Sequence, residues 1–322
     1  MANWIKGHKW LLHLLISFGL LAIVLINIDL RGTLEIIKNI SIPLFILGAL
    51  LFIPDRLFSA YRWFLLLRHI HPELPFFEVL RITLVSGFLG IFVPGAMGAE
   101  LLRIFGLRRS NITMATAVSS VMLERYFAII GLVALLFIGP LLSSDTLPGF
   151  ATITAWISFC IIVVSLLVLF NGRARAMTKR LVPGILRKWV LPKLNALYAS
   201  LDLYRGAPRV VVQGLFVGVV FQVFRTAHVY VLALSLGIEI NWFTFLAFDP
   251  AIRIATLLPI STLGIGVRDA GFVVAFTLVG ISAENAVALS TLFFTLTVLA
   301  ALPGAFLWKW GPRTETKTLV TN

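Results

Sequence analysis

The sequence has little charge, a single cysteine and no long polar stretch. Of its 322 residues, 13% are charged and 59% are hydrophobic, and the mean hydropathy is +0.99. Because soluble globular proteins contain about 25% charged residues, this composition excludes an ordinary soluble domain. The lone Cys160 excludes an internal disulfide and a cysteine metal pair. No zinc-protease, Walker A or nucleophile-elbow motif occurs, so the sequence predicts neither an enzyme nor a metal or other cofactor.

The sequence does contain many uncharged apolar runs. A helix needs about 20 such residues to cross a bilayer. The expected complete spans are 10–28, 42–67, 113–138, 151–170, 209–236 and 284–308. Regions 76–107 and 242–281 are also apolar, but each is interrupted, and several of the pieces are short for a crossing. We therefore expect an all-α polytopic membrane protein with six complete transmembrane helices and two broken or re-entrant helical hairpins.

The basic residues predict how the chain is oriented. The net charge is +13, but Lys and Arg lie between the apolar runs rather than on one basic face, so no nucleic acid partner is expected. The positive-inside rule places both termini in the cytoplasm and the connections 139–150 and 235–241 outside. The first run is too long for a signal peptide and is expected to be a retained span. The predicted location is the cytoplasmic membrane.

A single membrane domain is expected over residues 1–312, followed by a short cytoplasmic tail, 313–322. Segment 171–208 is strongly basic, with apolar residues at helical intervals between the charges. This pattern is typical of amphipathic helices at the membrane surface, here a pair broken at Pro183 and Pro192. Anionic lipid is the expected partner of this segment.

The two interruptions match each other in sequence. Pro94, Gly98 and Arg103 of PGAMGAELLR correspond to Pro259, Gly264 and Arg268 of PISTLGIGVRD, about 165 residues later, and Arg56 and Arg225 are 169 residues apart. Three complete crossings separate the interruptions, and an odd number inverts the second copy. The sequence therefore predicts an inverted repeat with halves at about 42–138 and 209–308, an organisation typical of secondary transporters.

The breaks supply the physical case for a binding site. The expected break residues are Pro94, Gly95 and Gly98 in the first region and Pro259, Gly264 and Gly266 in the second. Unpaired backbone groups at membrane depth are tolerated only inside protein or beside a wet cavity. Each break also exposes a helix N-terminus, which favours an anion. With Arg103 and Arg268 nearby, these parts predict a site for a phosphate or carboxylate head group.

Further charges lie inside the expected spans, where they are costly and commonly functional. Glu100 and Arg103 are three residues apart and either neutralise each other or share a site. Glu124 and Arg125 are adjacent on one helix and point in different directions, so each needs a partner on another helix. Arg103 is the natural partner for Glu124, either as a structural clamp or beside a ligand.

The second half carries a similar set of charges. Asp249 followed by a proline has the form of a helix cap, and Arg253 four residues later is placed to pair with it or with a ligand. Asp269 suits the first turn of a helix after the break. Arg225 is expected to face a cavity. Arg62, near a predicted boundary, is expected to extend to the membrane surface.

The motifs together resemble a known family. PGAMGAELLR, LERYF and PISTLGIGVRDAG, at these spacings, are similar to the membrane region of lysylphosphatidylglycerol synthases, which also occurs as stand-alone flippase-like proteins. The resemblance covers nearly the whole chain and implies a protein that moves an anionic or modified lipid between leaflets. It implies site roles for Arg103, Arg268, Glu100, Glu124 and Arg125, with Asp269 where the family usually has glutamate. The soluble synthase domain is absent from this sequence.

The expected function is thus a lipid translocase whose substrate carries an anionic head group. One alternative is a membrane transferase acting on a lipid carrier, with Asp29 or Glu35 as its carboxylate. Another is a non-transporting scaffold for a separate lipid-modifying enzyme. The sequence does not specify the lipid, the energy source or the oligomeric state.

Overall fold

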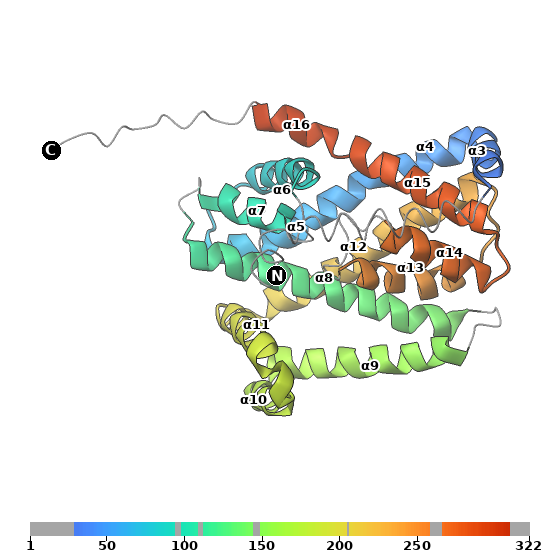
Figure 1. Cartoon of the computed structure of the whole chain (residues 1–322). Coiled ribbons are helices and arrows are strands. Elements are labelled where there is room, and N and C mark those ends of the chain that lie inside the picture. Colours follow the sequence, from blue (N-terminus) through green and yellow to red (C-terminus); the bar gives the residue numbers. More distant parts are fainter. Residues whose placement is uncertain are drawn as a thin grey trace, which may run out of the picture.

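The computed structural model describes residues 29–93, 98–108, 112–143, 149–204, 206–257 and 266–309, and in these ranges the regular structure is entirely helical (Figure 1). The first half contains α3 (Leu30–Lys38), α4 (Ile42–Leu50), α5 (Phe52–Ile70), α6 (Phe76–Gly90), α7 (Gly98–Arg108), α8 (Met114–Leu142) and α9 (Gly149–Phe170). The remainder contains α10 (Gly172–Leu181), α11 (Gly184–Asp202), α12 (Pro208–Ser235), α13 (Trp242–Thr256), α14 (Val267–Thr277), α15 (Ala283–Leu299) and α16 (Leu302–Lys309).

Five stretches are long and apolar enough to cross a membrane: Ile42–Ile70, Met114–Leu142, Ala151–Phe170, Pro208–Ser235 and Ala283–Trp308. They confirm five of the six predicted spans. The predicted span 10–28, the tail, and the break residues Pro94, Gly95, Pro259 and Gly264 lie outside the described residues. The all-helical multi-pass architecture is therefore as expected.

Both interrupted regions are two short helices separated by a break, as predicted. In the first, α6 has 15 residues and α7 has 11, and the two helices pack against each other. In the second, α13 has 15 residues and α14 has 11, and these also pack together. In Figure 1 the α6–α7 hairpin lies toward the left end of the bundle and the α13–α14 hairpin toward the right end.

The long helices α8 and α12 form the centre of the bundle. α8 packs against α12 and α13, while α12 also packs against α4 and α5. A Cβ atom added at Gly131 of α8 would lie 2.6 Å from the carbonyl oxygen of Gly218 of α12, so the backbones approach as closely as small residues allow. The last helix, α16, returns to pack on α6.

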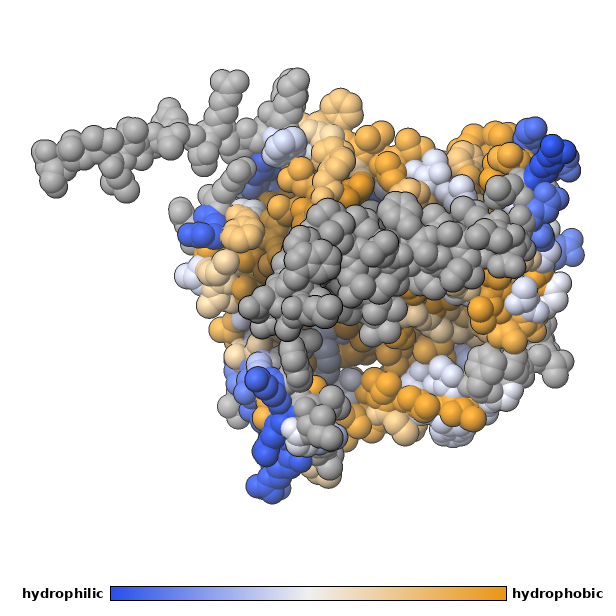
Figure 2. Space-filling view, viewed as in Figure 1, coloured by the Kyte–Doolittle hydropathy of each residue, from blue (hydrophilic) through white to orange (hydrophobic). Residues whose placement is uncertain are grey.

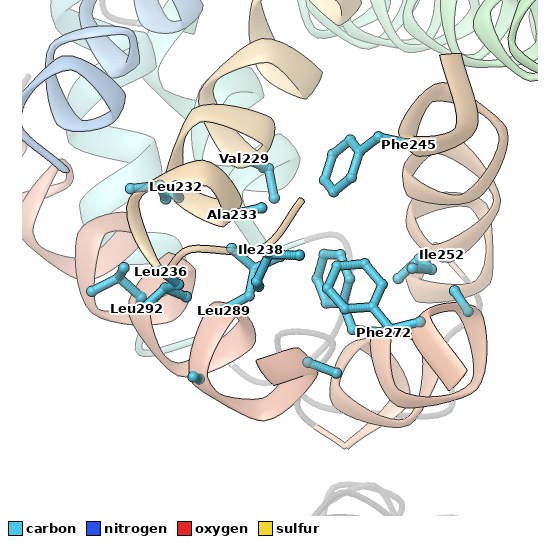
Figure 3. Close-up of a cluster of buried hydrophobic side chains, with 14 of the residues drawn as sticks. Val229, Leu232, Ala233, Leu236, Ile238, Phe245, Ile252, Phe272, Leu289 and Leu292 are labelled. Carbon is cyan, nitrogen blue, oxygen red and sulfur yellow. The ribbon is translucent and has the colours of Figure 1, made fainter. Parts of the chain in front are cut away.

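The largest apolar cluster fills the space among α12, α13, α14 and α15. It includes Leu232, Phe245, Phe272 and Leu289, all nearly inaccessible to solvent. Figure 3 shows these side chains converging from the four helices. This packing holds the second hairpin against α12 and α15 through close van der Waals contact, which drives helix association in a membrane.

The outer surface is largely apolar, as a lipid-facing surface must be (Figure 2). Helix α9 exposes Trp156, Ile157, Leu167 and other large apolar side chains, and Cys160 is exposed on the same helix. Hydrophilic residues gather at the lower left of Figure 2, over α10 and α11, and at the upper right, over α3. The basic helices thus lie at one end of the bundle.

Two expectations about prolines are wrong. Helices α10 and α11 are separated at Pro183 as expected, but Pro192 lies inside α11 and does not break it. Pro250 likewise lies inside α13, which begins eight residues earlier with Asn241 as its N-cap, the Asn241 side chain accepting a hydrogen bond from Phe243 N at 2.8 Å. A proline removes one backbone hydrogen bond, and packing within a bundle compensates for the loss.

Candidate functional site

A first charged cluster lies between α5, α7 and α8. The carboxylate of Glu124 on α8 accepts hydrogen bonds from Arg62 of α5 and from Arg103 of α7, the latter at 3.4 Å. The side chain of Arg62 is only 2% exposed and that of Glu124 only 6%. The Arg62 guanidinium also lies 4.4 Å from the centroid of the Phe221 ring. A single carboxylate therefore joins three helices deep in the protein.

Neutral side chains surround this cluster. Trp63 donates its indole N–H to the Ser120 hydroxyl at 3.1 Å, and Arg103 donates to the Ser59 hydroxyl at 3.5 Å. The Arg103 guanidinium lies 5.4 Å from the Trp63 ring centroid. Buried polar groups need such partners, since an unpaired one costs about 1–3 kcal/mol.

The pairing of the predicted residues is largely as the helix geometry requires. Glu124 and Arg125 find partners on other helices, as predicted: Arg103 reaches Glu124, and Arg125 donates to Glu100 of α7. The alternative in which Glu100 and Arg103 neutralise each other is wrong, because each pairs with α8 instead.

The placement of Arg62 corrects a further expectation. We expected it at the membrane surface, but it is buried beside Glu124. Helix α5 continues to Ile70, so Arg62 lies two turns before its end rather than at its boundary. Ser59 and Trp63, close to Arg62 in the sequence, are polar or amphipathic as well. This local run was the sequence signal that could have indicated a buried polar cluster on α5.

A second charged cluster lies between α12 and α13. Arg253 makes two contacts with the Asp249 carboxylate, at 3.1 Å from Nε and 2.8 Å from Nη2. Thr226 donates to the same carboxylate at 2.7 Å, and Arg253 also donates to the carbonyl oxygen of Arg225 at 2.8 Å. The expected pairing of Asp249 with Arg253 is confirmed. The expected helix-cap role of Asp249 is wrong, because it lies in the middle of α13.

At the start of α14, Asp269 organises the second break. Its carboxylate accepts from the backbone N–H of Gly266 at 2.7 Å and from the hydroxyl of Ser290. Arg268 donates to Ser290 at 2.9 Å and lies 3.4 Å from Asp269. Gly266 has φ +80°, which favours glycine because other residues rarely adopt it. The chain's own carboxylate thus satisfies this helix N-terminus.

A cavity of about 160 Å³ opens beside the second cluster. Arg225, Arg253, Arg268 and Asp249 supply its charged lining, three positive groups and one negative. The phenyl rings of Phe272, Phe293 and Phe294 supply much of its apolar lining, and the Arg268 guanidinium lies 5.2 Å from the Phe293 ring centroid. The Nη1 atom of Arg253 is buried and has no hydrogen-bond partner.

This arrangement is suited to an anion attached to an apolar group. One positive charge, that of Arg225, remains after Arg253 pairs with Asp249 and Arg268 with Asp269. This charge and a free guanidinium N–H favour a phosphate or carboxylate, and the rings favour a neighbouring apolar portion. Of the predicted site residues, Arg225 and Arg268 line this cavity, whereas Arg103, Glu100, Glu124 and Arg125 lie in the ion pairs of the first cluster. In the described part of the chain no three His, Cys, Asp or Glu side chains are grouped as metal ligands.

These observations define a multi-pass α-helical membrane protein with buried arginines on two broken hairpins. The chain belongs to the lysylphosphatidylglycerol synthase transmembrane region family, whose model matches residues 10–304, nearly the whole chain. The family was expected from the sequence motifs, and it makes this a lipid-related membrane protein. No curated protein sequence matches the chain significantly.

Proposed function

We propose that this protein is a lipid translocase that moves an anionic or modified phospholipid, or a lipid-linked head group, between the leaflets of the cytoplasmic membrane. The cavity among α12–α15 carries the proposal, because it combines three arginines with aromatic rings inside an apolar bundle. Buried charges at membrane depth are expensive and mark transport paths or binding sites by default. The head-group anion binds Arg225, Arg253 and Arg268.

The order of the helices supports an inverted repeat. A long helical span, a 15-residue helix, an 11-residue helix and a further long span occur in the first half and again in the second. Packing between the halves is reciprocal, since α8 packs on α13 of the second hairpin and α16 packs on α6 of the first. Rocking of one half against the other would give alternating access to the cavity.

In this proposal both termini are cytoplasmic, and the basic helices α10 and α11 rest on the cytoplasmic surface. Their seven Lys and Arg residues include Arg173, Arg180, Arg187 and Lys188. Such a surface attracts anionic lipid at about 1 kcal/mol per basic residue. The protein itself transfers no amino acid, and a separate enzyme supplies any modified lipid. No cofactor takes part in the translocation that we propose.

The test is lipid flipping in proteoliposomes. Wild-type protein should accelerate the flipping of head-group-labelled phosphatidylglycerol, and the double variant Arg225→Gln/Arg268→Gln should reduce the rate at least tenfold. A matched control, Arg68→Gln/Arg209→Gln, removes two exposed charges outside α10 and α11 and should leave the rate unchanged. Equal rates in protein-containing and empty vesicles, for both anionic and zwitterionic lipids, would contradict the proposal and favour an enzyme or scaffold.

A further inference from the structure

Two arginines occupy equivalent places on the first long helix of each half. Arg56 lies on α5 and Arg225 on α12, and these two helices pack against each other. Arg56 has one carboxylate nearby, Asp55, at 3.8 Å from its Nε, which is too long for a hydrogen bond. Arg225 lies over the Phe221 ring at 5.6 Å and has no ion pair with any described residue. Both cations are therefore loosely held.

Arg56 lines a small cavity of its own. The cavity has a volume of about 40 Å³ and is bounded by Thr83, Gly87 and Ile91 of the first hairpin region and by Thr297 of α15. Ile91 and Thr297 also line the 160 Å³ cavity that contains Arg225. The two cavities are thus neighbours, separated only at these shared side chains.

The small cavity offers less room for a head group in this conformation. Its volume of about 40 Å³ is a quarter of the 160 Å³ of the larger cavity. The buried Nε of Arg56 has no hydrogen-bond partner, and 29% of the Arg56 side chain is nevertheless exposed. A donor that is buried, charged and unpaired has an interaction to gain when an anion arrives.

Electrostatics link Arg56 to both charged clusters. Its charge is attracted by Asp55 and repelled by Arg225 and Arg103. A phosphate between Arg56 and Arg225 would relieve this repulsion, because it would place a negative charge between two positive ones. Arg56 and Arg225 would bind the anion through the same kind of group at two adjacent positions, and an anion that moves through a protein requires such a series of positions.

We propose that Arg56 is a second head-group station, to which the lipid phosphate passes from Arg225 across Ile91 and Thr297 during translocation. The inference rests on the proposed function. In the present conformation the cavity at Arg225 is about four times larger than the cavity at Arg56. Rocking of the two halves would widen the small cavity as it narrows the large one. The ligand class is a lipid whose head group presents a phosphate.

Two variants test this station separately from the first. Arg56→Gln removes the cation. Gly87→Val fills the small cavity, and a Cβ atom at Gly87 would meet no atom within 4 Å, so the fold should tolerate it. Arg68→Gln, exposed on the same helix, and Gly149→Val, which also points into open space, are the matched controls. Thermal unfolding in detergent checks that each variant is folded.

Binding and flipping distinguish the possible results. Binding of short-chain phosphatidylglycerol to the detergent-solubilised variants should stay within twofold of wild type, while their flipping rate falls at least tenfold. Arg56→Lys should retain more flipping than Arg56→Gln. Wild-type flipping in both Arg56→Gln and Gly87→Val would overturn the second station and leave the translocase intact. Loss of binding in Arg56→Gln equal to that in Arg225→Gln would also overturn it, and failure of wild type to flip would overturn both proposals.

Discussion

The two charged clusters have similar compositions and different surroundings. The first contains Arg62, Arg103 and Glu124 and is joined across α5, α7 and α8 by one carboxylate. The second contains Arg225, Arg253 and Asp249 and opens, beside Arg268 of α14, into a cavity of about 160 Å³. The exposure of the arginines does not distinguish the clusters, because Arg103 in the first is 14% exposed and Arg253 and Arg268 at the second are 13% and 11% exposed. The clusters differ in the cavity that only the second one opens into.

This difference indicates that the two clusters have different roles. A buried ion pair with excellent geometry contributes modest net stability, but removing one partner leaves an uncompensated charge and is severe. The first cluster is therefore best understood as a clamp that holds α7 to α5 and α8. The second has surplus positive charge and empty space, which are the properties of a binding site. Residue type and burial do not separate the two roles, but free volume does.

The largest expected effect is on the clamp. Glu124→Gln leaves Arg62 and Arg103 without their shared carboxylate, so we expect a loss of about 3–5 kcal/mol in the free energy of unfolding. Thermal unfolding of the purified protein in detergent measures it, with the exposed Glu73→Gln as the control. Unchanged stability together with lost flipping would reverse our assignment and make Glu124 part of the substrate site.

The next effect concerns the cavity. Arg225→Gln should weaken binding of short-chain phosphatidylglycerol about tenfold or more, because a hydrogen bond to a charged group contributes about 1.5–3 kcal/mol. Stability should stay close to wild type, since Arg225 forms no ion pair with a described residue. Arg209→Gln, exposed on the same helix, is the control in a titration followed by calorimetry. Equal affinities would remove Arg225 from the site.

A smaller effect is expected where the helices carrying the two clusters meet. Gly131→Ala would place a methyl group 2.6 Å from the carbonyl oxygen of Gly218, forcing α8 away from α12. Overpacking of this kind costs about 1–3 kcal/mol, partly offset by the higher helix propensity of alanine. Gly149→Ala, in open space, is the control in the same unfolding assay. If Gly131→Ala left unfolding and flipping unchanged, the close contact would have no role in coupling the clusters.

The smallest effect concerns the connection before α12. The hydroxyl of Tyr204 donates to the carbonyl oxygen of Leu66 at 3.1 Å, and burial raises the pKa of Tyr204. Tyr204→Phe should cost about 0.5–1.5 kcal/mol. Because the folded pKa is raised, wild type should lose stability above about pH 10, where the unfolded tyrosine ionises, and the variant should lose less. Parallel pH profiles of unfolding for the two proteins would contradict this account.

Periodicity and simple helix geometry predicted much of the fold. Long apolar runs placed five of the spans correctly, and the Pro-Gly interruptions placed both hairpins. The need of Glu124 and Arg125 for partners on other helices followed from geometry as well, and Arg103 was the expected partner of Glu124. The contacts of Glu124 with Arg62 and of Arg125 with Glu100 were not predicted. These predictions needed only local sequence and the cost of an unpaired charge in a membrane.

Other features depended on tertiary packing. A proline after an aspartate is a good helix start in isolation, yet Pro250 lies inside α13. The helix begins earlier, with Asn241 as its N-cap, and packing against neighbouring helices compensates for the backbone hydrogen bond that the proline removes. Arg62 was misplaced because its depth depends on where α5 ends. Arg225 was expected to face a cavity, but the full lining could not be predicted, since it comes from α12 to α15 together with Ile91.

Cys160 has a practical consequence. It is the one cysteine in the sequence, and it is exposed on α9, among apolar side chains on the outer face of the bundle. A thiol-reactive fluorophore or nitroxide would therefore attach at a single defined position without any mutagenesis. Quenching of that probe by agents dissolved in either leaflet would report its depth in the bilayer. The native sequence can therefore be labelled at one position for spectroscopy.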